Sequence, residues 1–120
     1  MKKIHYNKLI RDNIPEAIEK NGGKYKIKQL DKQKYLRELI KKVEEEASAL
    51  PKVKTRQELI EEIGDVLDVI DQIKKDKKIK PLELKLARQR AQNKKGGFKK
   101  RLFLYWSTDD GYKSNEKKGK

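Results

Sequence analysis

The helical fold can be predicted from one stretch of the chain, Glu58-Leu-Ile-Glu-Glu-Ile-Gly-Asp-Val-Leu-Asp-Val-Ile-Asp-Gln-Ile73. Its apolar residues recur at spacings of three and four, which places them on one face of a helix: Leu59, Ile60, Ile63, Val66, Leu67, Ile70 and Ile73. With an advance of about 100° per residue, Glu62 and Asp65 share one flank of this stripe. Glu61 and Asp68 share the other flank. A carboxylate pair three residues apart favours a hard cation such as Mg²⁺, and a solvated acidic face is the alternative.

A second long helix is predicted to precede this acidic helix. It begins after a cap at Asp31 and runs to about Leu50, with an apolar stripe of its own. Glu46 lies at the margin of that stripe, whereas Glu45 is expected to point to solvent. Glu46 is therefore the acid of this helix that is placed to face inward.

A short turn joins the two long helices and predicts how they pack. Thr55 and Glu58 form a capping box, with Thr55 as N-cap and Glu58 at the third helical position. Long helices connected by so short a turn pack antiparallel. We therefore expect Glu46 to converge with Glu62 and Asp65 across the helix pair.

Two further helices are predicted from proline and glycine signals. Pro15 leads into a short helix closed by Asn21-Gly22-Gly23, and Pro81 begins a third long helix that ends near Lys95-Gly96-Gly97. Residues 24–30 and 101–106 alternate or are rich in aromatic residues, which predicts a two-stranded antiparallel ribbon. The fold class is thus mainly α, with three long helices and a short leading one, in a single domain over 1–106. A polar tail at 107–120 is expected to be disordered.

The composition limits the classes of protein that fit this chain. Only 34% of the 120 residues are hydrophobic and 43% are charged, so the core is thin and a homodimer or larger even assembly is expected. The absence of cysteine excludes disulfides and thiolate zinc sites, and a single histidine, His5, cannot form a histidine cluster. No apolar run approaches the ~20 residues of a membrane span, and no secretory signal is seen. The simplest expectation is a cytoplasmic protein.

The net charge of +14 is distributed unevenly. Residues 44–71 hold nine acids and three bases, whereas residues 72–101 hold 13 lysines or arginines and two acids. An acidic centre beside a basic segment suits a polyanion bridged by a cation, with carboxylates holding the metal and basic side chains meeting the phosphates. Plain solubility is the alternative interpretation.

Three motifs occur in order along residues 4–106: Tyr6-Asn-Lys-Leu-Ile-Arg-Asp-Asn-Ile-Pro15, Glu45-Glu-Ala-Ser-Ala49 followed after twelve residues by Glu62-Ile-Gly-Asp65, and Lys95-Gly-Gly-Phe98. Together they resemble the MazG-like, or phosphoribosyl-ATP pyrophosphohydrolase-like, superfamily of all-α nucleotide pyrophosphohydrolases. Within it, the match is to the small house-cleaning branch, which usually has Arg-Gly-Gly-Phe at the last motif. The fold that this resemblance implies is a MazG-like helical bundle.

In that superfamily, Glu-Glu-x-x-Glu, a gap and then Glu-x-x-Asp supply the Mg²⁺ ligands. By position, the resemblance implies Glu46, Glu62 and Asp65 as the catalytic metal ligands, with Mg²⁺ as cofactor and Mn²⁺ as an alternative. The fourth ligand position falls on Ala49, which departs from the pattern. A register through Glu45 reaches Ser48 and gives no second carboxylate either. Water and phosphate oxygens can complete the coordination of Mg²⁺.

The activity that the resemblance implies is Mg²⁺-dependent hydrolysis of a nucleoside triphosphate to a nucleoside monophosphate and pyrophosphate. Lys8, Arg11 and Lys95 are the expected phosphate-binding cations. One alternative is a catalytically impaired nucleotide-binding or regulatory relative, to which Ala49 points. Another is a basic nucleic-acid-binding module using residues 72–101, although that segment has no RNA-binding aromatic motif and no helix-turn-helix signature.

Overall fold

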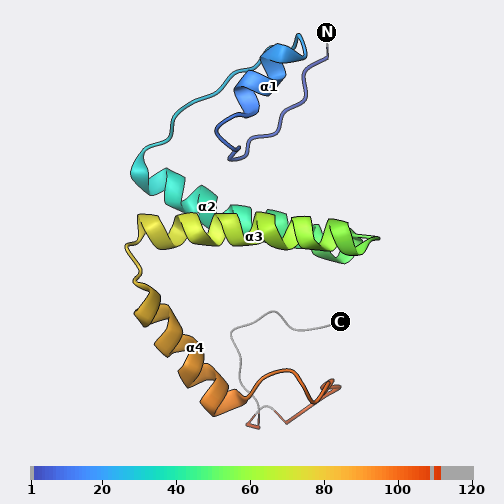
Figure 1. Cartoon of the computed structure of the whole chain (residues 1–120), viewed down its shortest axis with the longest axis vertical. Coiled ribbons are helices and arrows are strands. Elements are labelled where there is room, and N and C mark those ends of the chain that lie inside the picture. The colour runs from blue at the N-terminus through green and yellow to red at the C-terminus, as the bar shows by residue number, and fades with distance from the viewer. Residues whose placement is uncertain (1, 109, 112–120) are drawn as a thin grey trace. The chain divides into compact units, whose positions relative to one another are not determined.

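The described part of the chain, residues 2–108 and 110–111 of a computed structural model, is mainly helical, as the sequence predicts. It contains four α-helices, α1 (Ile14–Lys20), α2 (Lys32–Ser48), α3 (Arg56–Asp76) and α4 (Pro81–Lys95), and a short 3₁₀ helix η1 (Leu50–Lys52) (Figure 1). Residue contacts divide the chain into two compact units, 1–81 and 82–120. The single domain over 1–106 stays a prediction.

The central feature of the first unit is the hairpin of α2 and α3, which lie side by side (Figure 1). Both helices begin directly after the N-cap residues that the sequence predicts, Asp31 and Thr55. The Asp31 side chain accepts a hydrogen bond from the Lys34 N–H at 2.8 Å, and Thr55 Oγ1 accepts one from the Glu58 N–H at 3.1 Å. Because η1 and a few residues make the whole connection, the two helices run antiparallel.

The apolar stripes of the hairpin are only partly covered. Leu39 of α2 is the one buried apolar residue in the described part of the chain, at 4% exposure. On α3, by contrast, Leu67 is 51% exposed, and large exposed fractions are also found at Leu59, Ile60 and Ile63. The spacing of these residues predicts one buried face, and in this single chain that face is only partly buried. α2 alone covers one side of the α3 stripe, and the stripe is wide enough to pack against two helices.

The remaining helices also begin and end where the sequence predicts. α1 has Pro15 in its first turn and ends at Asn21, followed by Gly22 at φ 75°. α4 starts at Pro81, the last residue of the first unit, and ends before Gly96 at φ 79°. None of the residues of α4 is buried.

The expected two-stranded ribbon is not confirmed. Residues 24–30 and 101–106 form no strand, and their apolar side chains, such as Ile27 and Leu102, are exposed. The two segments belong to different units, and neither unit offers them another strand to pair with among the described residues. Of the expected disordered tail, residues 109 and 112–120 lie outside the described residues. No helix in the described ranges has the length and apolar character needed to cross a lipid bilayer.

Candidate metal centre

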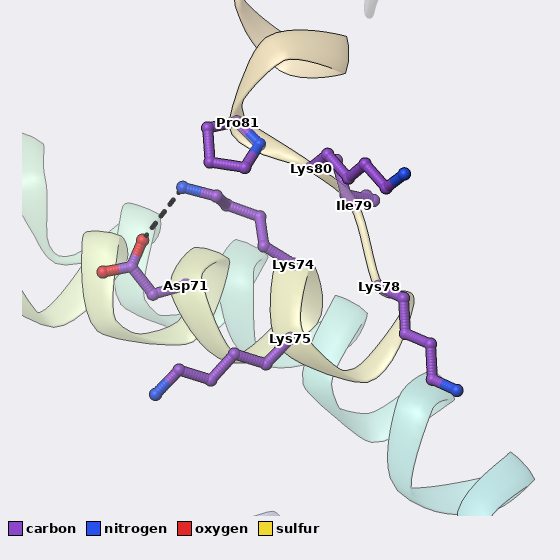
Figure 2. A pocket seen from close by; sticks show the side chains of 7 residues that line it. All are labelled: Asp71, Lys74, Lys75, Lys78, Ile79, Lys80 and Pro81. Atoms are coloured by element: carbon purple, nitrogen blue, oxygen red, sulfur yellow. Dashed lines mark ion pairs between the residues drawn. The ribbon is translucent and has the colours of Figure 1, made fainter.

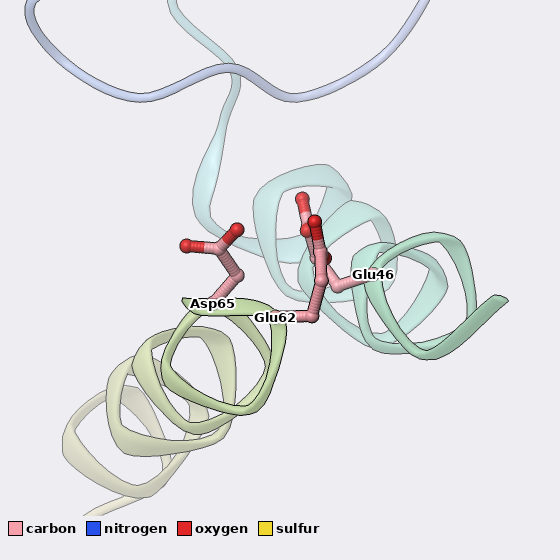
Figure 3. Close-up of side chains that lie close together, drawn as sticks. All are labelled: Glu46, Glu62 and Asp65. Carbon is pink, nitrogen blue, oxygen red and sulfur yellow. The ribbon is translucent and has the colours of Figure 1, made fainter. Parts of the chain in front are cut away.

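Three carboxylates predicted from the sequence lie together on the α2–α3 hairpin. Glu46 comes from the last turns of α2, and Glu62 and Asp65 come from α3. One oxygen from each lies within 4.8 Å of the other two, and each residue is half-buried. The three side chains project to the same side of the hairpin (Figure 3). The antiparallel packing and the three-residue spacing on α3 account for this convergence.

The surroundings of Glu62 in this cluster disfavour its charged form. Loss of solvent contact is the largest cause that raises the pKa of Glu62 above its usual value, and the neighbouring Asp65 and Glu46 carboxylates raise it further. Carboxylates that repel one another are stabilised by a cation placed between them. Oxygen donors of this kind fit the coordination preference of Mg²⁺.

Lys42 partly neutralises the α2 side of the cluster. Its Nζ atom lies 3.5 Å from Glu46 and 3.0 Å from Glu45, and its side chain is only 13% exposed. The spacing of four residues between Lys42 and Glu46 is a signal that was present in the sequence and was missed. The negative charge of Glu46 is therefore partly offset by Lys42 before any cation binds.

Lys8 attaches the N-terminal segment to the same helix. Its Nζ atom donates a hydrogen bond to Glu45 Oε1 at 2.7 Å, and this contact is the largest cause that lowers the pKa of Glu45. Glu45 was expected to point to solvent, and its side chain keeps 37% exposure. It is not free there, because it is paired with both Lys8 and Lys42.

Arg11 reaches the α3 side of the cluster. Its Nη2 atom donates to Asp65 Oδ1 and to Asp68 Oδ2, both at 3.0 Å. The sequence placed Asp65 and Asp68 on opposite flanks of the stripe. The structure shows that they nevertheless meet at one guanidinium, because residues three apart on a helix are neighbours. Helix periodicity placed Asp68 on the flank of Glu61 but did not predict its pairing with Arg11, because Arg11 comes from a segment with no regular structure.

The other two positions singled out from the sequence have different surroundings. Ala49 follows the last residue of α2 with helical dihedral angles, φ −79° and ψ −21°, and its N–H donates to the Glu46 carbonyl at 3.2 Å. Lys95 is the last residue of α4 and belongs to the second unit. Lys8 and Arg11 are thus brought to the acidic hairpin, whereas a role for Lys95 stays a prediction.

A shallow depression of about 570 Å³ lies at the end of α3, away from the carboxylates. Four lysines line it together with Asp71, Ile79 and Pro81: Lys74, Lys75, Lys78 and Lys80. Their amines point in different directions, and Lys74 is turned toward Asp71, 3.5 Å away (Figure 2). A compact anion site needs donors that converge on one point. This depression therefore provides positive charge but no built anion site.

Comparison of the sequence with models of known protein families gives no match, and comparisons with curated proteins and with solved structures give none either.

Proposed function

We propose that this protein is a Mg²⁺-dependent nucleoside triphosphate pyrophosphohydrolase of the MazG-like superfamily, which releases a nucleoside monophosphate and pyrophosphate. One observation carries the proposal. Three residues chosen from sequence motifs and helix geometry, Glu46, Glu62 and Asp65, come from two different helices and lie with their oxygens within 4.8 Å. Acidic residues on helix surfaces do gather without a metal, so the motif order along the chain is the second support.

Each group of residues has a role in this proposal. Glu46, Glu62 and Asp65 would hold the cation through carboxylate oxygens, with water and substrate oxygens as further ligands. A bound Mg²⁺ supplies Lewis acidity, which lowers the pKa of water and offsets charge on the phosphate oxygens. Lys8 and Arg11 stand beside the carboxylates and would bind the phosphate chain, and Lys95 is assigned the same role from its motif alone.

We further propose that the protein acts as a homodimer or larger even assembly. The support is the apolar stripe of α3, where Ile60, Ile63 and Leu67 remain exposed, while Leu39 is the one buried apolar residue among those that the structure describes. Contiguous exposed apolar residues commonly mark protein interfaces. A second copy packing helix against helix would cover the stripe.

A nucleotide-binding or regulatory relative without activity is the second candidate, and Ala49 is the observation that favours it. A carboxylate is missing at this position, one turn from Glu46. Such a relative would bind Mg²⁺ and nucleotides without hydrolysing them. The basic nucleic-acid-binding module has less support, because the lysines at the end of α3 do not converge (Figure 2).

A pyrophosphate-release assay across natural and damaged nucleoside triphosphates, with and without Mg²⁺, tests the proposal. We expect Mg²⁺-dependent release with at least one nucleotide, and loss of release in Glu62→Gln. The matched control is Glu61→Gln, which removes an exposed acid from the next position of the same helix. Nucleotide binding without release would favour the regulatory relative. Absence of both binding and release would contradict both candidates.

A further inference from the structure

Arg11 presents only one corner of its guanidinium group to the α2–α3 hairpin. Both hydrogen bonds, to Asp65 and to Asp68, come from the Nη2 atom. A guanidinium carries five N–H donors, so those on Nε and Nη1 remain. Neither of these nitrogens bonds another residue within the described ranges, and the side chain is 58% exposed. The outer edge of Arg11 is therefore open to a ligand.

The two aspartates bound to Arg11 have different surroundings. Asp65 belongs to the candidate metal centre, where a cation would compete for its charge. Asp68 lies outside that cluster, and Arg11 is its only ion-pair partner in the described part of the chain. Asp68 can therefore keep its hydrogen bond to Arg11 when Asp65 binds a cation.

The segment that carries Arg11 needs such a tether. Residues 2–13 form no helix or strand, so the backbone alone does not fix the long arginine side chain. Ordering a flexible side chain at the moment of binding costs free energy, and holding it in place beforehand reduces that cost. The planar edge of a guanidinium matches two oxygens of one phosphate group.

We propose that Asp68 is a positioning residue that holds Arg11 beside the carboxylate cluster, so that the free edge of Arg11 binds the phosphate chain of a nucleotide. This inference rests on the proposed function for the identity of the ligand. Asp68 itself contacts neither the cation nor the phosphates. Its effect on phosphate binding passes through Arg11.

The direction in which Asp68→Asn changes triphosphate affinity separates this role from a general charge effect. Removing a carboxylate near an anion site normally favours the anion, because like charges repel. Asp68→Asn is expected to do the opposite and weaken binding of inorganic triphosphate by about two- to fivefold, the range that exposed ion pairs support. The matched control is Asp71→Asn, which removes an equally exposed acid one turn further along α3 and should leave binding unchanged or slightly tighter.

The experiment measures triphosphate affinity by calorimetry for wild type, Asp68→Asn, Arg11→Lys and the double variant, together with Mg²⁺ affinity. We expect the double variant to bind no more weakly than Arg11→Lys, and Mg²⁺ affinity to be the same in wild type and Asp68→Asn. Additive losses, unchanged triphosphate affinity in Asp68→Asn, or no triphosphate binding by wild type would overturn the inference.

The same variants keep this inference distinct from the proposed function. If nucleotides are hydrolysed, Asp68→Asn should raise KM and leave kcat unchanged, and Asp68→Glu should restore part of the affinity. Hydrolysis with a wild-type KM in Asp68→Asn would contradict the positioning role alone. Triphosphate binding that depends on Asp68, without any hydrolysis, would contradict the enzyme and support the positioning role.

Discussion

A carboxylate oxygen of Glu46 in α2 lies within 4.8 Å of one of Glu62 in α3, so two like charges from neighbouring helices share one small region. Such an arrangement opposes folding when no cation is present.

Glu62→Gln should stabilise the protein at neutral pH in the absence of divalent cations. The folded-state pKa of Glu62 is raised, so the folded protein holds the Glu62 proton more tightly than the unfolded chain, and ionisation costs stability as pH rises through that pKa. The gain in unfolding free energy from Glu62→Gln should therefore be present at neutral pH and disappear at pH values below the ordinary glutamate pKa. Chemical denaturation of both proteins across this pH range measures it. A gain that persists in acid would contradict the electrostatic cause.

Lys8→Met should destabilise the protein by about 0.2–1 kcal/mol near neutral pH, discounted because both partners of its ion pair with Glu45 are partly exposed. Since the pKa of Glu45 is lowered, this contribution is present above the ordinary glutamate value and is lost as pH falls through the lowered pKa. Denaturation curves of the two proteins should converge in acid. A difference that is independent of pH would show that Lys8 acts through packing.

Ala49→Glu should tighten Mg²⁺ binding by roughly threefold or more, because a carboxylate one turn from Glu46 adds charge and a ligand oxygen. Ala49 has helical dihedral angles, so the new side chain would leave the backbone as it does in a further turn of α2. Release of pyrophosphate should also rise, or begin. Ala49→Gln has the same size without the charge and serves as control. Equal Mg²⁺ affinity in both variants would place the centre elsewhere.

Sedimentation should show a dimer or larger even assembly at tens of micromolar protein, a range in which even weak dimers persist. Leu67→Lys places a charge on the exposed stripe of α3 and should shift the protein to monomer. Glu61→Lys changes an exposed polar position of the same helix and should leave the assembly intact. A wild-type monomer at these concentrations would contradict the proposed assembly.

The sequence predicted the helices well because their signals are local. Asp31 and Thr55 cap as expected, and Gly96 follows α4 with a positive φ angle. The convergence of Glu46 with Glu62 and Asp65 followed from helix periodicity and a short connection, which leave one packing arrangement.

The contacts of irregular segments could not be predicted in the same way. Arg11 and Lys8 come from residues without periodicity, and their partners lie more than thirty positions away in the chain. The predicted ribbon is not confirmed for a related reason, because strand pairing depends on a partner that the alternating pattern does not identify. The exposure of the α3 stripe likewise depends on which elements pack around the helix, and helix periodicity does not identify those elements.

Calorimetric titration of Mg²⁺ into wild type, Glu46→Gln, Glu62→Gln and Asp65→Asn tests the central claim most directly, with Glu61→Gln as control. We predict a saturable isotherm for wild type and for the control, and an affinity lowered by about tenfold or more in each of the other three, since each loses a charged ligand. A wild-type protein that gives no isotherm, or five proteins that give the same one, would show that these carboxylates form a solvated acidic face and not a metal centre.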